Sequence, residues 1–121
     1  MEENQIQPQP YWADFKIKVG LYVNQNEGGE TKRVLIDPKD IQFKFIYKDS
    51  KDNQLVASYD GNTRVNHKIE DNHIIVIVNS NTFKCGLLKV TRVFNTPDSD
   101  FNDGVWDYGD KTVYTNIEIV S

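Results

Sequence analysis

The chain has 121 residues, of which 38% are hydrophobic and 26% charged, and a formal net charge of −4. This length fits one domain, and the apolar content excludes a compositionally disordered chain. The acidic balance argues against a nucleic-acid partner, and the single cysteine, Cys85, excludes an internal disulfide framework.

The first eleven residues differ from the rest of the chain, because glutamines and prolines dominate them without apolar periodicity. Prolines remove backbone donors and favour extended geometry, so we expect an extended N-terminal arm over residues 1–11. The segment lacks the basic and apolar regions of a secretory signal, which predicts no export. Two interpretations stay open: a frayed terminus, or a strap that docks on a neighbouring subunit and buries Ile6, Tyr11 and Trp12.

From residue 12 onward, apolar and polar residues alternate, as in strands with one face on a core. Gly20 is interpreted as a bulge through which the first strand continues to residue 23. The segment 24–30 is expected as a turn or exposed loop, and 37–41 as one short helical turn. Strands are expected at 15–19, 33–36, 41–47, 55–59, 63–69, 73–78, 87–94, 105–108 and 112–120.

This pattern predicts an all-β fold. About seven to nine strands with short turns indicate an antiparallel immunoglobulin-like β-sandwich over residues 12–121. The longest apolar run, Ile74 to Val78, is far shorter than the ~20 residues that span a bilayer, so no membrane partner is expected.

The loop from Asp98 to Gly104 is the first candidate metal site, because alternating oxygen ligands wrap calcium in EF-hand loops. The spacing differs from that motif: Asp103 stands at the sixth position, where the motif has glycine, and Gly109 at the twelfth, where it has glutamate. A solvated turn is the preferred interpretation, and calcium binding stays open.

The remaining candidates for chemistry carry weak signals. His67, His73 and Cys85 show no zinc-ligand spacing, and the chain has no GxSxG motif. We therefore predict no enzymatic activity, no cofactor and no metal. The basic residues Lys16, Lys18, Lys32 and Arg33 are interpreted as solvated strand positions.

Four aromatic residues form the remaining candidates: Tyr11, Trp12, Trp106 and Tyr108. Aromatic side chains of a sandwich belong to the core, to a subunit interface or to a sugar-binding platform. All three alternatives stay open here. With Ile6, these four residues are our candidates for an interface.

Several segments, taken in order, resemble a family of small immunoglobulin-like modules in phages and prophages of Bacteroides-type hosts, including crAss-like phages. These modules are similar to the N-terminal domain of baseplate upper proteins. The resemblance covers most of residues 14–120. It rests on DFKIKV, VLIDPKDIQFKFIY, SYDG, EDNHIIVIV, CGLLKVTRVF, FNDG and TNIEIV.

The resemblance implies a non-enzymatic virion protein, a head-fibre or tail/baseplate attachment module that assembles in the bacterial cytoplasm. It implies other virion proteins as partners and a homo-oligomer such as a trimer, with the N-terminal arm as the anchor to the particle. The alternative function is a carbohydrate-binding module that grips cell-surface glycan through exposed aromatic side chains.

Overall fold

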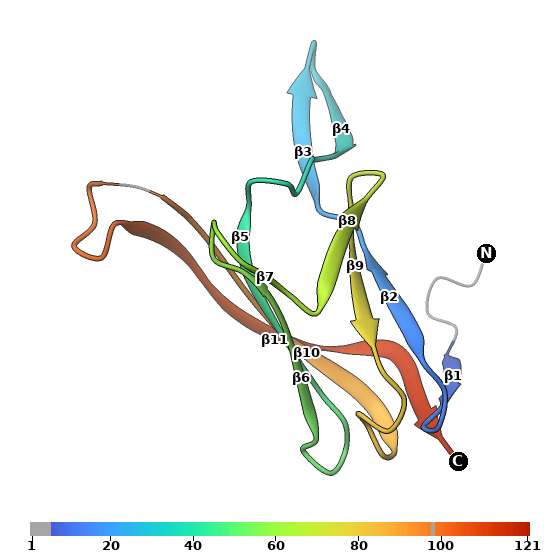
Figure 1. The fold of residues 1–121 in the computed structure, drawn as a ribbon. Coiled ribbons are helices and arrows are strands. Elements are labelled where there is room, and N and C mark those ends of the chain that lie inside the picture. The colour runs from blue at the N-terminus through green and yellow to red at the C-terminus, as the bar shows by residue number, and fades with distance from the viewer. Residues whose placement is uncertain (1–5, 98) are drawn as a thin grey trace.

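The structure is a computed structural model that describes residues 6–97 and 99–121, without the side chains of 96–97 and 105–110. Within this part of the chain all regular structure is β, in eleven strands and three sheets (Figure 1). The expected all-β class is confirmed, although the described strands outnumber the seven to nine expected. No helix of the described residues is long and apolar enough to cross a membrane.

The largest sheet has six strands in the order β1-β11-β10-β5-β6-β7. β1 pairs with β11 in parallel, and every other pairing in this sheet is antiparallel. The strands are β1 (Gln7–Pro10), β5 (Gln42–Lys48), β6 (Gln54–Tyr59), β7 (Arg64–Val65), β10 (Gly86–Pro97) and β11 (Val105–Val120).

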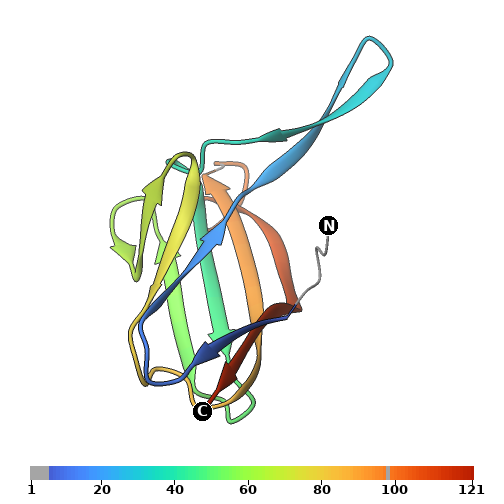
Figure 2. The ribbon, with the colours of Figure 1, turned by 90° about the vertical axis from the view of Figure 1, so that its right-hand side faces the viewer.

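The second sheet has three antiparallel strands in the order β2-β9-β8, namely β2 (Phe15–Val19), β9 (His73–Val78) and β8 (His67–Glu70). The third is a two-stranded hairpin of β3 (Tyr22–Glu27) and β4 (Glu30–Leu35). In Figure 2 the second sheet lies across the face of the first, whereas the hairpin projects away from both.

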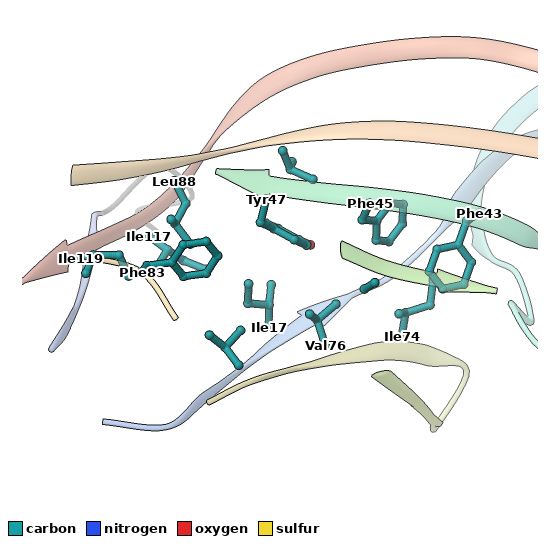
Figure 3. Packing of buried hydrophobic residues seen from close by; sticks show 13 residues of the cluster. Ile17, Phe43, Phe45, Tyr47, Ile74, Val76, Phe83, Leu88, Ile117 and Ile119 are labelled. Atoms are coloured by element: carbon teal, nitrogen blue, oxygen red, sulfur yellow. The ribbon is translucent and has the colours of Figure 1, made fainter. Parts of the chain in front are cut away.

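The core lies between the two larger sheets (Figure 3). Alternate residues of β2, β5, β6, β9, β10 and β11 face it, because successive side chains of a strand point to opposite sides. Within it the ring centres of Phe43 and Phe45 lie 4.7 Å apart. The core residues are Ile17, Phe43, Phe45, Tyr47, Ala57, Ile74, Val76, Val78, Phe83, Leu88, Val90, Ile117 and Ile119.

The chain passes from the first sheet to the second at Asn66, between β7 and β8. Asn66 has φ 58°, a left-handed conformation that asparagine tolerates better than most residues. Its Nδ2 donates to the carbonyl of Val56 (2.9 Å), and its carbonyl accepts from the amide of Ile77 (2.9 Å). The single strand expected over 63–69 is therefore two strands in different layers.

Two expectations near Gly20 are wrong. The first strand does not continue through a bulge, because β2 ends at Val19 and the chain leaves its sheet. A Cβ at Gly20 would lie 2.9 Å from the Tyr22 ring and 3.1 Å from the His73 ring, so this exit is closely packed. Of the turn or exposed loop expected over 24–30, only Gly28 and Gly29 form a turn, at φ 58° and 85°, and the other residues belong to strands.

The region around the acidic loop also differs from the expectation. β10 extends to Pro97, and β11 begins at Val105 and runs without interruption through the two strands expected at 105–108 and 112–120. The segment 37–41 is a hydrogen-bonded turn, in which the Ile41 amide donates to the carbonyl of Pro38 (3.1 Å).

The described part of the N-terminal segment lies against its own domain. Gln7 pairs with Ile117 and Pro10 with Val120, so β1 is an edge strand of the large sheet. The amide of Tyr11 donates to the carbonyl of Val120 (2.9 Å), and its carbonyl accepts from the amide of Asn81 (2.7 Å). An edge position suits the two prolines, because they cannot donate to a strand on either side.

Candidate binding surfaces

Two of the five predicted interface residues, Tyr11 and Trp12, occupy the turn that leads from β1 into β2. Ile6 precedes β1 and therefore lies at the other end of that strand. All three are exposed, with Trp12 at 62% the most exposed of them. These three side chains are therefore not part of the core, and the subunit interface and the sugar-binding platform stay as their alternatives.

The other two predicted residues belong to the opposite end of β11. Trp106 and Tyr108 are in its first half, where the backbone of Trp106 is paired with Thr96, but their side chains lie outside the described residues. Twelve residue steps lead from Tyr108 to Val120, roughly 40 Å measured along the strand at the usual rise per residue. The five predicted residues therefore do not form one continuous surface.

A groove of about 500 Å³ lies at the base of the β3–β4 hairpin, where the hairpin leaves the body. Two guanidinium groups, from Arg33 of β4 and Arg92 of β10, lie among its mainly apolar side chains. Arg33 stacks over the ring of Tyr22, with 4.3 Å between the guanidinium carbon and the ring centre. The apolar lining comes from Leu21, Tyr22, Val23, Ile36, Ile41 and Phe94.

Arg92 has an unusual position in the sheet. Its register with Phe45 places it on the inner face of β10, in the same alternation as Leu88 and Val90, yet it is exposed where the two sheets part. Burial raises the pKa of the nearby Tyr47 to about 12, although the charge of Arg92 opposes this shift. Arg92 stands at a position where the alternation of β10 calls for an inward apolar residue. This misplaced arginine was the signal in the sequence that could have revealed the groove, and it was not recognised.

Asp49 is the buried carboxyl of the described core, with 1% of its surface exposed. Its oxygens accept hydrogen bonds from the amides of Lys51 (2.9 Å), Asn53 (2.9 Å) and Lys84 (2.6 Å), and from Asn53 Nδ2 (3.0 Å). Burial acts to raise the pKa of Asp49, but these hydrogen bonds outweigh it and hold the pKa below its ordinary value. Asp49 joins the β5–β6 turn to the segment before β10.

The histidines and the cysteine lie apart from one another. His67 packs edge-on against Phe43, with 4.8 Å between ring centres, whereas His73 Nδ1 contacts the carbonyl of Asp71 (2.8 Å). Cys85 Sγ lies 3.4 Å from Ser50 Oγ. Among the described residues no group of three or more His, Cys, Asp or Glu is placed to hold a metal ion.

The acidic loop is described in part, because Asp98 lies outside the described residues. In the remainder, the amide of Gly104 donates to the carbonyl of Phe101 (3.0 Å), and the Phe101 ring is exposed. A solvated turn stays the prediction for this loop, and calcium binding stays the open alternative.

The basic residues that are close in the sequence lie on two different elements. Lys16 and Lys18 are on the outer face of β2, and Lys32 and Arg33 are on the projecting hairpin. Lys68 of β8 lies on the same outer face as Lys18, and it forms an ion pair with Glu70 at 2.8 Å.

Comparison of the chain with protein-family models, curated proteins and solved structures finds no match.

Proposed function

We propose that this protein is a non-enzymatic structural module of a phage virion, a head-fibre or tail/baseplate attachment domain with an immunoglobulin-like sandwich as its scaffold. Two facing sheets around one core support this proposal, because such a scaffold holds its surfaces in fixed positions. The protein assembles in the bacterial cytoplasm, forms a homo-oligomer and binds other virion proteins.

The exposure of Trp12 is the observation that carries the proposal. Trp12 follows the exposed Tyr11 in the turn after β1, and large aromatic side chains in this setting commonly dominate protein–protein contacts. The turn that presents Trp12 is fixed on both sides. The Ala13 amide donates to the carbonyl of Pro10 (3.2 Å), and Asp14 Oδ1 accepts from the amide of Ser80 (2.7 Å).

The test compares particles assembled with Trp12→Ala and with Tyr114→Ala. Tyr114 is an exposed aromatic residue on the large sheet and serves as the matched control. Mass spectrometry of purified particles should show loss of the Trp12 variant and retention of the Tyr114 variant. Retention of Trp12→Ala at the wild-type level would overturn the proposed anchor. A point variant is preferable to deletion of residues 1–11, because deletion removes β1 from the edge of β11.

Carbohydrate binding is the second candidate, and the 69% exposure of Tyr114 favours it. Tyr114 is paired with Lys89 on the outer face of the large sheet, two residues from Thr112, whose hydroxyl lies 2.8 Å from that of Thr91. An exposed aromatic ring of this kind suits stacking on a sugar ring. A glycan array would support this function if binding were seen and lost in Tyr114→Ala, and silence on all glycans would reject it.

A further inference from the structure

The β3–β4 hairpin is paired with nothing else in the described chain. Its two strands form a sheet of their own and project from the body in both views (Figures 1 and 2). All six residues of β3 are exposed, including Tyr22 at 46%. An isolated two-stranded ribbon is marginally stable in water, so an additional strand along one edge would stabilise it.

The turn determines which backbone groups face outward. A two-residue turn at Gly28 and Gly29 makes Glu27 and Glu30 a hydrogen-bonded pair, and such pairs recur at every second position. The hydrogen bond from the Ile36 amide to the Leu21 carbonyl (2.9 Å) agrees with this pattern, because Leu21 and Ile36 stand an even number of positions from the pair of Glu27 and Glu30. The outward amides and carbonyls therefore belong to Tyr22, Asn24 and Asn26 on β3, and to Thr31, Arg33 and Leu35 on β4.

The two edges differ in charge. An antiparallel contact between two β3 edges, centred on Asn24, places Asn24 opposite Asn24 of the second copy and Tyr22 opposite Asn26. No charged side chain falls within this paired span of residues 22–26. The corresponding contact between two β4 edges centres on Arg33 or on Lys32. It places like charges directly opposite each other, which is destabilising.

We propose that two copies of this chain associate by antiparallel pairing of their β3 edges, which gives a four-stranded sheet in the order β4-β3-β3-β4. The contact is isologous, so it closes as a dimer and leaves the two charged β4 edges outside. Tyr22 adds a rigid ring to the contact, because it is held beneath the Arg33 guanidinium. This inference does not depend on the proposed virion function.

Analytical ultracentrifugation from about 1 µM to 1 mM tests the proposal with a matched pair of variants. Asn26→Pro removes an outward amide from β3, and Thr31→Pro removes one from β4 on the same rung of the hairpin. Both variants lose the 2.8 Å hydrogen bond from Thr31 Oγ1 to Asn26 Oδ1, so this loss is common to them. The difference between the variants is the edge that the proline blocks. The wild type and Thr31→Pro should dimerise with similar dissociation constants. The dissociation constant of the Asn26→Pro dimer should be higher by about tenfold or more.

Asn24→Lys provides a second variant that leaves the hairpin backbone unchanged. It places two lysines at the two-fold axis, so the dimer should weaken at low salt and recover in part at high salt. A monomeric wild type, a trimeric mass, or equal weakening by Asn26→Pro and Thr31→Pro would overturn the proposal. So would a dimer that neither Asn26→Pro nor Asn24→Lys weakens.

Discussion

Asp49 shows how one buried carboxylate connects two segments that are distant in the sequence. Its hydrogen bonds to Lys51 and Asn53 shape the β5–β6 turn, and its bond to the Lys84 amide spans 35 residues of sequence. Removing the charge leaves buried amide donors with a weaker or missing acceptor, which costs more than a surface hydrogen bond gains.

Asp49→Asn should lower the free energy of unfolding by about 2–3 kcal/mol, measured by urea denaturation at neutral pH. Asparagine keeps the shape of aspartate but points an amide group at donors that require an acceptor. Asp52→Asn is the control in the same turn, because Asp52 is exposed and its φ of 62° suits asparagine. Equal stability of Asp49→Asn and the wild type would contradict this role.

The same carboxylate predicts an acid dependence of stability. The pKa of Asp49 is lower in the folded protein than the ordinary 3.8. Its contribution is therefore fully present above pH 3.8 and is lost as the pH falls through the folded pKa. Urea midpoints between neutral pH and pH 3 should fall less steeply in Asp49→Asn than in the wild type. An identical fall in both proteins would exclude Asp49 as a source of acid lability.

His67 predicts a second pH dependence, at higher pH. Arg64 Nη1 lies 3.1 Å from His67 Nε2, and since arginine always donates, Nε2 accepts and the Nδ1 proton is donated to the Val65 carbonyl (2.9 Å). Burial and the charge of Arg64 lower the pKa of His67 below the ordinary 6.5, despite the bond to Val65. This part of the stability is present above pH 6.5 and is lost as the pH falls through the folded pKa.

Nitrogen-15 NMR of the imidazole ring measures this directly. The neutral ring should carry its proton on Nδ1, and the titration midpoint of His67 should lie below 6.5. Ring-nitrogen shifts that place the proton on Nε2, or a midpoint above 6.5, would contradict the network of Arg64, His67 and Val65.

At the level of elements, the strands that the sequence predicted well carry either apolar alternation or a β-branched run. The alternation over 15–19 marks β2, although its expected continuation to residue 23 is wrong, and 41–47, 55–59 and 73–78 match β5, β6 and β9 within one residue at each end. Local patterns were enough for these strands because their inner faces meet one common core.

The β3–β4 hairpin could not be found in this way. Residues 24–27 are Asn, Gln, Asn and Glu, which carry no apolar alternation, and their pairing depends on the Gly28-Gly29 turn. Asp49 was likewise hidden in a polar connection, because its partner Lys84 is supplied by the tertiary fold. The predicted interface residues are separated by the lengths of β1 and β11, which no local pattern reveals.

A shortened hairpin tests whether β3 and β4 stand apart from the core. Replacing residues 24–33 by Asn-Gly should change the free energy of unfolding by less than about 0.5 kcal/mol at low protein concentration, because all of these residues are exposed and their strands pair only with each other. Urea denaturation with circular dichroism provides the measurement. A loss above about 2 kcal/mol would show that the hairpin supports the core.

For the whole molecule, stability should come from one core that both larger sheets share. Leu88 of β10 is fully buried in it, so Leu88→Ala should lower the free energy of unfolding by about 3 kcal/mol. Amide signals from β5 and from β9 should lose intensity at the same urea midpoint, because the two sheets unfold together. Tyr114→Ala, on the exposed face, should stay within about 0.5 kcal/mol of the wild type. Separate midpoints for the two sheets would contradict a shared core.

The central claim is that the β3–β4 hairpin is separate from the shared core and that its β3 edge is free to pair with a second copy. Amide hydrogen exchange, measured for each residue at two protein concentrations, tests this claim most directly. Amides of β5, β9 and β10 should exchange slowly at both concentrations, because they belong to the buried sheets. The outward amides of Asn24 and Asn26 should exchange fast in dilute protein and slowly in concentrated protein. Slow exchange of these two amides at both concentrations, or fast exchange at both, would contradict the account.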